Sequence, residues 1–362
     1  VIYDFATNKY FNYPAAQVQP NEVLAYAMWS SESVPFDPME KSIHTLYEQS
    51  FTIDDRPLYK MVHEYPLDGA PPVMTHVFRN AANDTIIACK GGVESILRQS
   101  VLTDEQKQQM LEVTQQLSAQ GYRVLAVAKS AKSYDKFPAT QAEFDYTFLG
   151  LIAFSDPPKK NTASIITSFY QAGIGVKMIT GDYAPTAIAI AKQIGIQNHQ
   201  AVLTGDEIML MDAVTIQEKV KATNVYARMF PEAKLKVIEA FKRNGEVVAM
   251  TGDGVNDGPA LKAAHIGIAM GQRGTEIAKQ AASLILTDDN LQHLVEAVAL
   301  GRRIYENLKK AIRYIISIRI PIILIVTIPL LFFWDFTDFF NPIHVIMLEL
   351  IMGPTWSIIV EH

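Results

Sequence analysis

Residues 250–259 read MTGDGVNDGP, and this stretch decides the fold expected for the chain. It begins where the apolar run Glu246–Met250 predicts a buried strand, and a short helical pattern follows at Pro259–Ala264. Glycines let the backbone turn tightly, and two carboxylates and an amide place hard oxygen atoms on the turn, which suits Mg²⁺. These side chains belong to Asp253, Asn256 and Asp257. The alternative interpretation is a loop with acidic caps.

From about Phe148 onward, short apolar strands alternate with helical patterns. The predicted strands are Phe148–Phe154, Gly175–Ile179, Val225–Arg228, Glu246–Met250, Ile266–Met270 and Ser283–Leu286. The predicted helices between them include Asn161–Ala172, Ala184–Ile194 and Pro231–Arg243. This alternation predicts an α/β fold with a doubly wound parallel sheet. In such sheets the chemistry takes place at the carboxyl ends of the strands.

Two further polar clusters lie at such positions. Thr180, Gly181 and Asp182 follow a predicted strand, and the helix that begins directly afterwards favours an anion at its N-terminus. Lys234 lies in the first turn of the helix that Pro231 opens, where it could neutralise a phosphoryl group. Taken singly, the first cluster could be an ordinary turn and the lysine a solvated surface residue.

Together these sites resemble those of the haloacid dehalogenase superfamily, and TGDGVNDGPALKAAHIGIAMG at 251–271 resembles the hinge motif of P-type ATPases. The resemblance runs over the whole chain and implies an ATP-driven cation transporter that works through an aspartyl-phosphate, with ATP and Mg²⁺ as cofactors. The catalytic residues it implies are Thr180, Gly181, Asp182, Lys234 and Asn256. It places the metal on Asp253 and Asp257.

The same resemblance implies a nucleotide-binding domain. Residues 90–94 (KGGVE) resemble the KGAPE motif, so Lys90 and Gly91 would lie at the adenine pocket, and Tyr65 would stack on adenine. Four more residues match family positions near the nucleotide: Glu40, Arg123, Asp156 and Arg228. The segment 65–78 (YPLDGAPPVMTHVF) lacks the basic residues that the family has after the stacking aromatic, so we expect weak nucleotide binding.

Two apolar runs near the C-terminus, Tyr314–Trp334 and Pro342–Val360, are each close to the ~20 residues that cross a bilayer. The basic segment GRRIYENLKKAIR precedes them and the short acidic DFTDFFN separates them, which predicts a membrane hairpin with the bulk of the chain in the cytoplasm. The alternative is a pair of buried core helices. In the family these would be the fifth and sixth helices of a multi-pass protein of the plasma or cell membrane.

The resemblance also bears on the cation. Arg319 and Glu349 occupy positions where calcium pumps carry an asparagine on each helix, which argues against the usual calcium site. The hypothesis is that they pair inside the bundle and leave a proton or a single cation as cargo. Otherwise Arg319 extends to the interface and Glu349 is structural.

We expect three parts: a phosphorylation domain from residues 1–10 and 146–312, an inserted α+β nucleotide-binding domain from 11–145, and the hairpin from 313–362. The family nucleophile, the aspartate of DKTGT, is not found, and Asp4-Phe5-Ala6-Thr7 is only faintly similar. The chain is therefore expected to begin after this motif, to need the preceding part of the pump, and to be inactive alone. A non-catalytic nucleotide-binding or regulatory module and a soluble phosphatase of the superfamily remain alternatives.

Composition excludes several other classes. The net charge of -6 and the absence of a basic stripe argue against nucleic acid as a partner. The single cysteine, Cys89, excludes a disulfide framework within the chain. A Rossmann dehydrogenase is excluded because no GxGxxG follows the first strand and because the glycine-rich turn carries acids.

Overall fold

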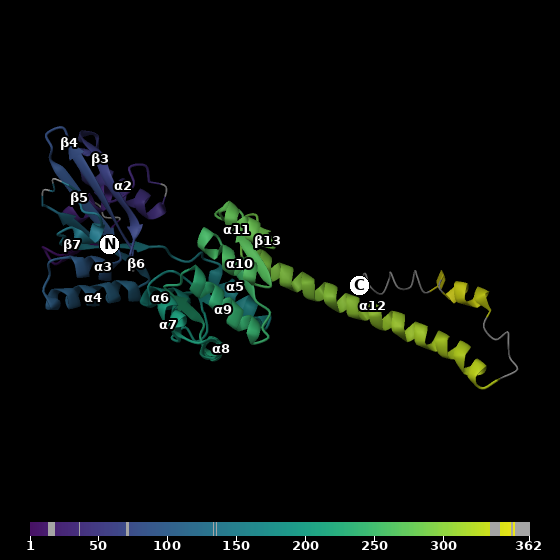
Figure 1. The fold of residues 1–362 in the computed structure, drawn as a ribbon. Coiled ribbons are helices and arrows are strands. Elements are labelled where there is room, and N and C mark those ends of the chain that lie inside the picture. Colours follow the sequence, from purple (N-terminus) through teal and green to yellow (C-terminus); the bar gives the residue numbers. More distant parts are fainter. Residues whose placement is uncertain are drawn as a thin grey trace. The chain divides into compact units, whose positions relative to one another are not determined.

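A computed structural model describes residues 1–13, 19–35, 37–69, 72–132, 134, 136–333, 341–348 and 350–351. The chain divides into two compact units, Val1–Ile285 and Leu286–His362 (Figure 1). The described strands form one seven-stranded antiparallel sheet and two three-stranded sheets.

The antiparallel sheet has seven strands in the order β2-β1-β7-β6-β5-β4-β3. Their bounds are β1 Ile2–Asp4, β2 Lys9–Phe11, β3 Tyr59–Asp68, β4 Val73–Asn80, β5 Thr85–Gly91, β6 Tyr122–Ser130 and β7 Thr147–Ser155. Helices pack on both faces of it. They are α1 Glu22–Trp29, α2 Pro38–Ser50, α3 Val93–Gln99 and α4 Asp104–Ala119, and short 3₁₀ turns lie at Arg56–Leu58 and Gln141–Glu143.

Two hydrophobic clusters hold these helices to opposite faces of the sheet. Ile87 and Cys89 of β5 lie in the cluster that includes α3 and α4, whereas Ala88 between them lies in the cluster that includes α1 and α2. This separation follows from the period of two in a strand, which sends neighbouring side chains to opposite faces. Both faces of the sheet are therefore apolar at its centre.

The structure corrects the predicted limits of the phosphorylation domain. β1 pairs antiparallel with β7 in the register Ile2↔Ile152, so residues 1–10 and Thr147–Ser155 belong to the antiparallel sheet. Gly150 makes this pairing possible, since a Cβ there would overlap the carbonyl oxygen of Tyr3. The apolar run Phe148–Phe154 is a strand as predicted, but its neighbours β1 and β6 are both antiparallel to it.

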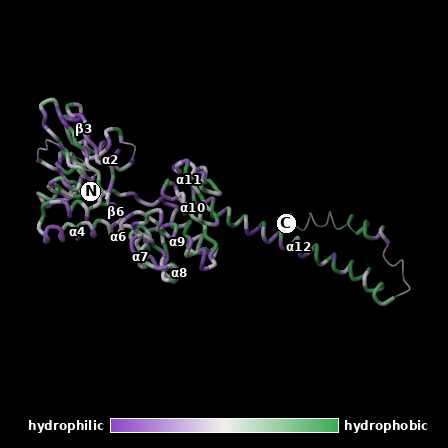
Figure 2. The backbone as a smooth tube through the Cα atoms, in the orientation of Figure 1, coloured by the Kyte–Doolittle hydropathy of each residue, from purple (hydrophilic) through white to green (hydrophobic). Residues whose placement is uncertain are grey.

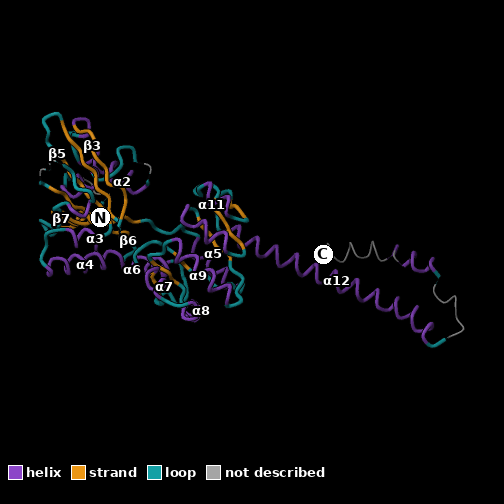
Figure 3. Tube along the Cα trace, in the orientation of Figure 1, coloured by secondary structure: helices purple, strands orange, loops and turns teal. Residues whose placement is uncertain are grey.

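After β7, the single doubly wound parallel sheet that was predicted is replaced by two three-stranded sheets of order β8-β10-β9 and β11-β12-β13 (Figure 3). β10 is parallel to both β8 and β9, and β11 is parallel to β12. Their bounds are β8 Met178–Ile179, β9 Val202–Thr204, β10 Val225–Ala227, β11 Ala249–Gly252, β12 Ile266–Met270 and β13 Leu284–Leu286. The helices are α5 Thr162–Gln171, α6 Ala184–Gln193, α7 Gly205–Leu210, α8 Ala213–Ala222, α9 Pro231–Arg243, α10 Gly258–Ala263 and α11 Glu276–Ala281. Ile179 and Val248 each pack against two core clusters and so join the hydrophobic interiors of this region.

The second unit is dominated by α12, which runs from Gln292 to Leu331 as one helix of 40 residues. At 1.5 Å per residue it is about 60 Å long, and Pro321 and Pro329 lie inside it. Among the described residues it is the one helix long and apolar enough to cross a membrane, with a mean hydropathy of 2.3 in its most apolar window (Figure 2). The described part of the second apolar run is helical at 342–348.

Candidate functional site

A cavity of about 920 Å³ lies in the first unit and is lined by both sheet regions. Seven of the residues singled out from the sequence line it: Glu40, Lys90, Gly91, Arg123, Gly181, Asp182 and Arg228. They come from segments up to 188 residues apart, from Glu40 to Arg228. The fold thus brings most of the predicted nucleotide residues to one place.

Lys90 and Glu40 form a buried ion pair in the wall of this cavity. The Lys90 Nζ donates to Glu40 Oε1 at 2.5 Å and to Ser31 Oγ at 2.6 Å, and the two side chains are 6% and 10% exposed. Burial lowers the pKa of Lys90, and the Glu40 carboxylate opposes that shift. Glu40 is held in place because Asp37 caps α2, whose first turn contains it.

Gly91 ends β5 directly after this lysine. A Cβ at Gly91 would lie 2.5 Å from the carbonyl oxygen of Pro72, so only glycine allows the start of β4 to pass so closely. Gly92 N donates to the same Pro72 oxygen at 2.9 Å. The KGG sequence therefore shapes the cavity wall through backbone contact.

The structure does not bring Tyr65 to the cavity, and this corrects its predicted stacking role. Glu64 lines the cavity, and the next side chain on β3 points to the other face of the sheet. Tyr65 is 6% exposed, its hydroxyl donates to the Pro138 carbonyl at 2.6 Å, and its ring packs edge-on against Phe144. Tyr65 is a core residue.

Thr180 and Asp182 form a closed turn after β8. The Thr180 hydroxyl donates to Asp182 Oδ2 at 3.1 Å and accepts from the Asp182 backbone N–H at 3.1 Å. The Asp182 carboxylate also lies 3.7 Å from the Arg123 guanidinium. The Asp182–Arg123 ion pair therefore links the turn after β8 to the antiparallel sheet across the cavity.

Arg228 adopts an uncommon backbone conformation for a non-glycine residue, with φ of 49°. Its N–H donates to the Asp182 carbonyl at 2.9 Å, its guanidinium pairs with Glu94, and it lies 4.9 Å from the centroid of the Tyr183 ring. Neither Glu94 nor Tyr183 has a role that was predicted from the sequence. Glu94 could have been found from its place at the end of KGGVE, whereas no local pattern pointed to Tyr183.

The glycine-rich turn after β11 holds a second lysine–acid pair. Lys234 Nζ donates to Asp257 Oδ1 at 2.6 Å, and the backbone N–H groups of Asp253 and Gly254 both donate to Asp257 Oδ2 at 3.3 Å. Gly252 is required beside it, because a Cβ there would lie 2.6 Å from the Asp257 Cβ. Asp253 and Asn256 are exposed at the rim of the turn. None of these residues lines the cavity described above.

The carboxylate oxygens of this turn are suitable ligands for Mg²⁺. An ionised carboxylate has about four acceptor positions, and the bonds to Asp257 use three of them, which leaves one on Oδ1. Asp253 is exposed and able to offer a second carboxylate oxygen. Mg²⁺ is usually held by one or two carboxylates together with water and phosphate oxygens, so Asp253 and Asp257 suffice chemically.

The remaining predicted residues lie elsewhere. Asp156 is exposed in the loop between β7 and α5 and does not line the cavity. Asp4, in the string faintly similar to the nucleophile motif, ends β1, and its carboxylate accepts from Thr7 N at 2.9 Å and Asn21 Nδ2 at 2.8 Å. Arg319 is exposed on α12, and Glu349 lies outside the described residues.

Comparison with known proteins identifies the family. The family model for haloacid dehalogenase-like hydrolases matches residues 67–265, more than half of the chain. The chain is 34% identical over 352 residues to calcium-transporting ATPase 1 of Bacillus cereus, which covers 94% of this chain and 38% of that protein. It is 36% identical over 285 residues to a calcium-transporting ATPase of Bacillus subtilis, covering 75% of this chain and 32% of that protein.

A probable cation-transporting ATPase F of Mycobacterium bovis is 39% identical over 264 residues, covering 69% of this chain and 29% of that protein. The chain therefore spans about a third of the length of these relatives. Taken with the TGDGVND turn and the parallel strands that carry it, these matches show that the chain belongs to the haloacid dehalogenase-like hydrolases and, among them, to the P-type ATPases.

Proposed function

We propose that this chain forms the nucleotide-binding and phosphorylation parts of an ATP-driven cation pump. The observation that carries this proposal is the cavity that contains both the buried Lys90–Glu40 pair and the guanidinium groups of Arg123 and Arg228. A buried amine and carboxylate offer a donor and an acceptor for a base, and guanidinium groups match phosphate oxygens well. ATP is therefore the ligand proposed for this cavity, with the antiparallel sheet as the nucleotide-binding domain.

The proposed phosphorylation domain contains the two parallel sheets. Phosphoryl transfer depends mainly on positioning and on neutralising charge. Lys234, already oriented by Asp257, would supply one positive charge, and the Thr180 hydroxyl and the Gly181–Asp182 backbone would contact phosphate oxygens. Asp253 and Asp257 would hold Mg²⁺, which would supply further positive charge beside the phosphate. Asn256 would help to hold this end of the turn.

The nucleophile of the pump is proposed to lie outside this chain. Asp4 belongs to the antiparallel sheet, and its carboxylate accepts hydrogen bonds from Thr7 and Asn21. We therefore do not propose Asp4 as the nucleophile. The chain of 362 residues is then expected to bind nucleotide without forming an acid-stable phosphoenzyme.

For the membrane part we propose a hairpin made by the apolar end of α12 and the second apolar run, within a multi-pass protein of the cell membrane. The length and hydropathy of α12 support this. The names of the relatives make calcium the first cation to test, against the proton or other single cation that Arg319 and Glu349 favour. If ATPase activity of the whole pump with Glu349→Gln keeps its ion dependence unchanged, the proposed role of Glu349 is wrong.

The nucleotide proposal is tested by calorimetry on the whole chain in detergent, with a non-hydrolysable ATP analogue and Mg²⁺. We expect Arg123→Ala to weaken binding at least several-fold, because its exposed guanidinium lines the cavity. Lys132→Ala is the matched control, since this lysine is paired with Asp145 and does not line the cavity. Equal binding by both variants, or none by the unaltered chain, would reject the assignment.

A further inference from the structure

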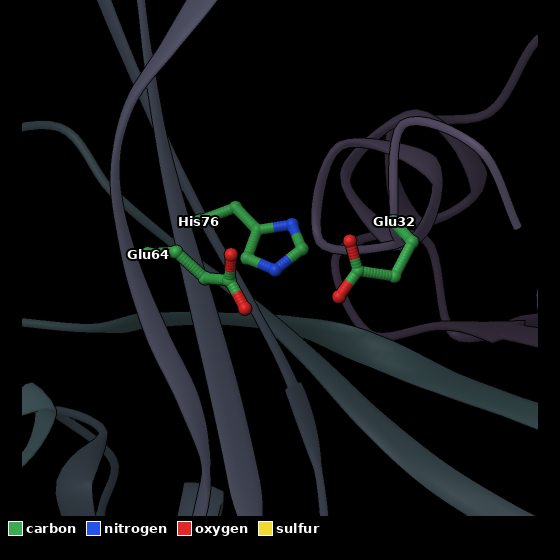
Figure 4. Close-up of side chains that lie close together, drawn as sticks. All are labelled: Glu32, Glu64 and His76. Atoms are coloured by element: carbon green, nitrogen blue, oxygen red, sulfur yellow. The ribbon is translucent and has the colours of Figure 1, made fainter.

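Three side chains converge beside the cavity in a way that the nucleotide proposal does not use. Glu32 lies between α1 and α2, Glu64 on β3 and His76 on β4, and their ligand atoms all lie within 4.8 Å of one another. Figure 4 shows the His76 ring between the two carboxylates. Glu32 and Glu64 line the cavity, whereas His76 is completely buried.

The hydrogen bonds of His76 determine which ring nitrogen is free. Its Nδ1 lies 3.2 Å from the Ser31 carbonyl oxygen. A carbonyl can only accept, so Nδ1 carries the hydrogen, and in the neutral imidazole Nε2 carries the lone pair. That Nε2 is buried and, among the described residues, has no hydrogen-bond partner.

Three acceptors therefore face one another: an imidazole lone pair and two carboxylates. Such an arrangement is repulsive unless a proton or a metal cation lies between them, and an unpaired buried polar atom is itself costly. Histidines that bind metal characteristically donate their other ring N–H to a carbonyl or carboxylate, as His76 does to Ser31. The geometry is that of a metal ligand with its supporting hydrogen bond already formed.

We propose that Glu32, Glu64 and His76 form a binding site for a borderline divalent cation such as Zn²⁺. One imidazole and two carboxylates suit zinc, whereas Mg²⁺ and Ca²⁺ prefer oxygen ligands alone. Zinc bonds of about 2.0–2.1 Å bring tetrahedral ligands about 3.3 Å apart, so the glutamates need only move closer by rotating their side chains. Water or a ligand in the cavity would take the fourth position.

The experiment is a titration of the metal-free whole chain in detergent with Co²⁺, whose visible spectrum reports its coordination, followed by displacement with Zn²⁺. We expect one site per chain that Zn²⁺ displaces and excess Mg²⁺ does not. Glu32→Gln and Glu64→Gln should each weaken it at least about tenfold, since changes to supporting residues alone cost about 10–100-fold. Neither variant disturbs the buried histidine, so folding should persist.

Glu94→Gln is the matched control, because it removes the same charge from the wall of the same cavity outside the cluster. It should leave the Co²⁺ affinity unchanged. His76→Gln should abolish the Co²⁺ spectrum if the variant folds. The proposal is overturned if no Co²⁺ binds, or if binding survives in both glutamate variants. None of these readouts depends on ATP binding, so failure here is distinguishable from failure of the proposed function.

Discussion

The two lysine–acid pairs of the first unit look alike and are held in different ways. The Lys90–Glu40 pair joins a strand to a helix, 50 residues apart, and the Lys90 amine also bonds to the Ser31 hydroxyl. The Lys234–Asp257 pair joins a helix to a glycine-rich turn, whose own backbone N–H groups hold the carboxylate. The first is 6% and 10% exposed, and the second is 12% at both partners.

This comparison indicates how far each charge depends on its partner. The environment of Lys90 is buried enough to lower its pKa, so its charge relies on Glu40 and Ser31. Asp257 keeps two backbone donors whether or not the lysine is present. We therefore expect loss of one partner to be much more damaging in the first pair than in the second.

The largest effect is expected for Lys90→Ala. It leaves Glu40 buried without its cation, and breaking a buried pair in this way costs about 3–5 kcal/mol. The double variant Lys90→Met/Glu40→Leu should recover most of that loss, because no buried charge remains. The measurement is the melting temperature of the whole chain, taken from the transition in which the antiparallel sheet unfolds. A double variant no more stable than Lys90→Ala would contradict this reading of the pair.

A smaller loss, about 1–3 kcal/mol, is expected for Lys234→Met. The Asp257 carboxylate loses its charged donor but keeps the N–H groups of Asp253 and Gly254. Denaturant unfolding of both lysine variants under one condition makes the comparison direct. If Lys234→Met destabilises as much as Lys90→Ala, the backbone donors do not support the carboxylate as proposed.

The turn itself can be tested with two glycines. Gly252→Ala places a Cβ 2.6 Å from the Asp257 Cβ, and relieving such a clash costs about 1–3 kcal/mol. Gly254→Ala meets its nearest atom, Asp257 Oδ2, at 3.7 Å and should be tolerated. The melting temperature and the Mg²⁺ affinity should both be lower for Gly252→Ala and unchanged for Gly254→Ala. Equal effects would show that the approach of Gly252 to Asp257 does not determine the turn.

The smallest effect is a pH dependence of stability. Burial lowers the pKa of Lys90 below its ordinary 10.5, so between the two pKa values the unfolded chain binds a proton that the folded chain lacks. The free energy of unfolding contributed by this group therefore increases as the pH rises through that window. The melting temperature of the unaltered chain, minus that of Lys90→Met/Glu40→Leu, should increase as the pH approaches 10.5. A difference that is flat or falls would contradict the direction of the shift.

Local patterns determined much of the parallel region. The helix at Pro231–Arg243 and the strand at Ile266–Met270 have the bounds predicted from proline placement and apolar runs, and α6 differs from its prediction by one residue. The TGDGVND turn was found from the local sequence alone, because glycine spacing and carboxylates are local properties. The short β9 with α7 and α8 was not predicted, since three residues give too little periodicity to recognise.

Sequence by itself thus determined the alternating strands and helices, the acidic glycine-rich turn, the long apolar helix and the family. Only the tertiary structure decided that Ile2–Asp4 pairs with a strand about 150 residues away, that Tyr65 faces the core, and that Glu64 and His76 approach Glu32. The physical reason is that strand partners and faces depend on contacts between distant segments. A shift of one residue in register sends every side chain of a strand to the opposite face.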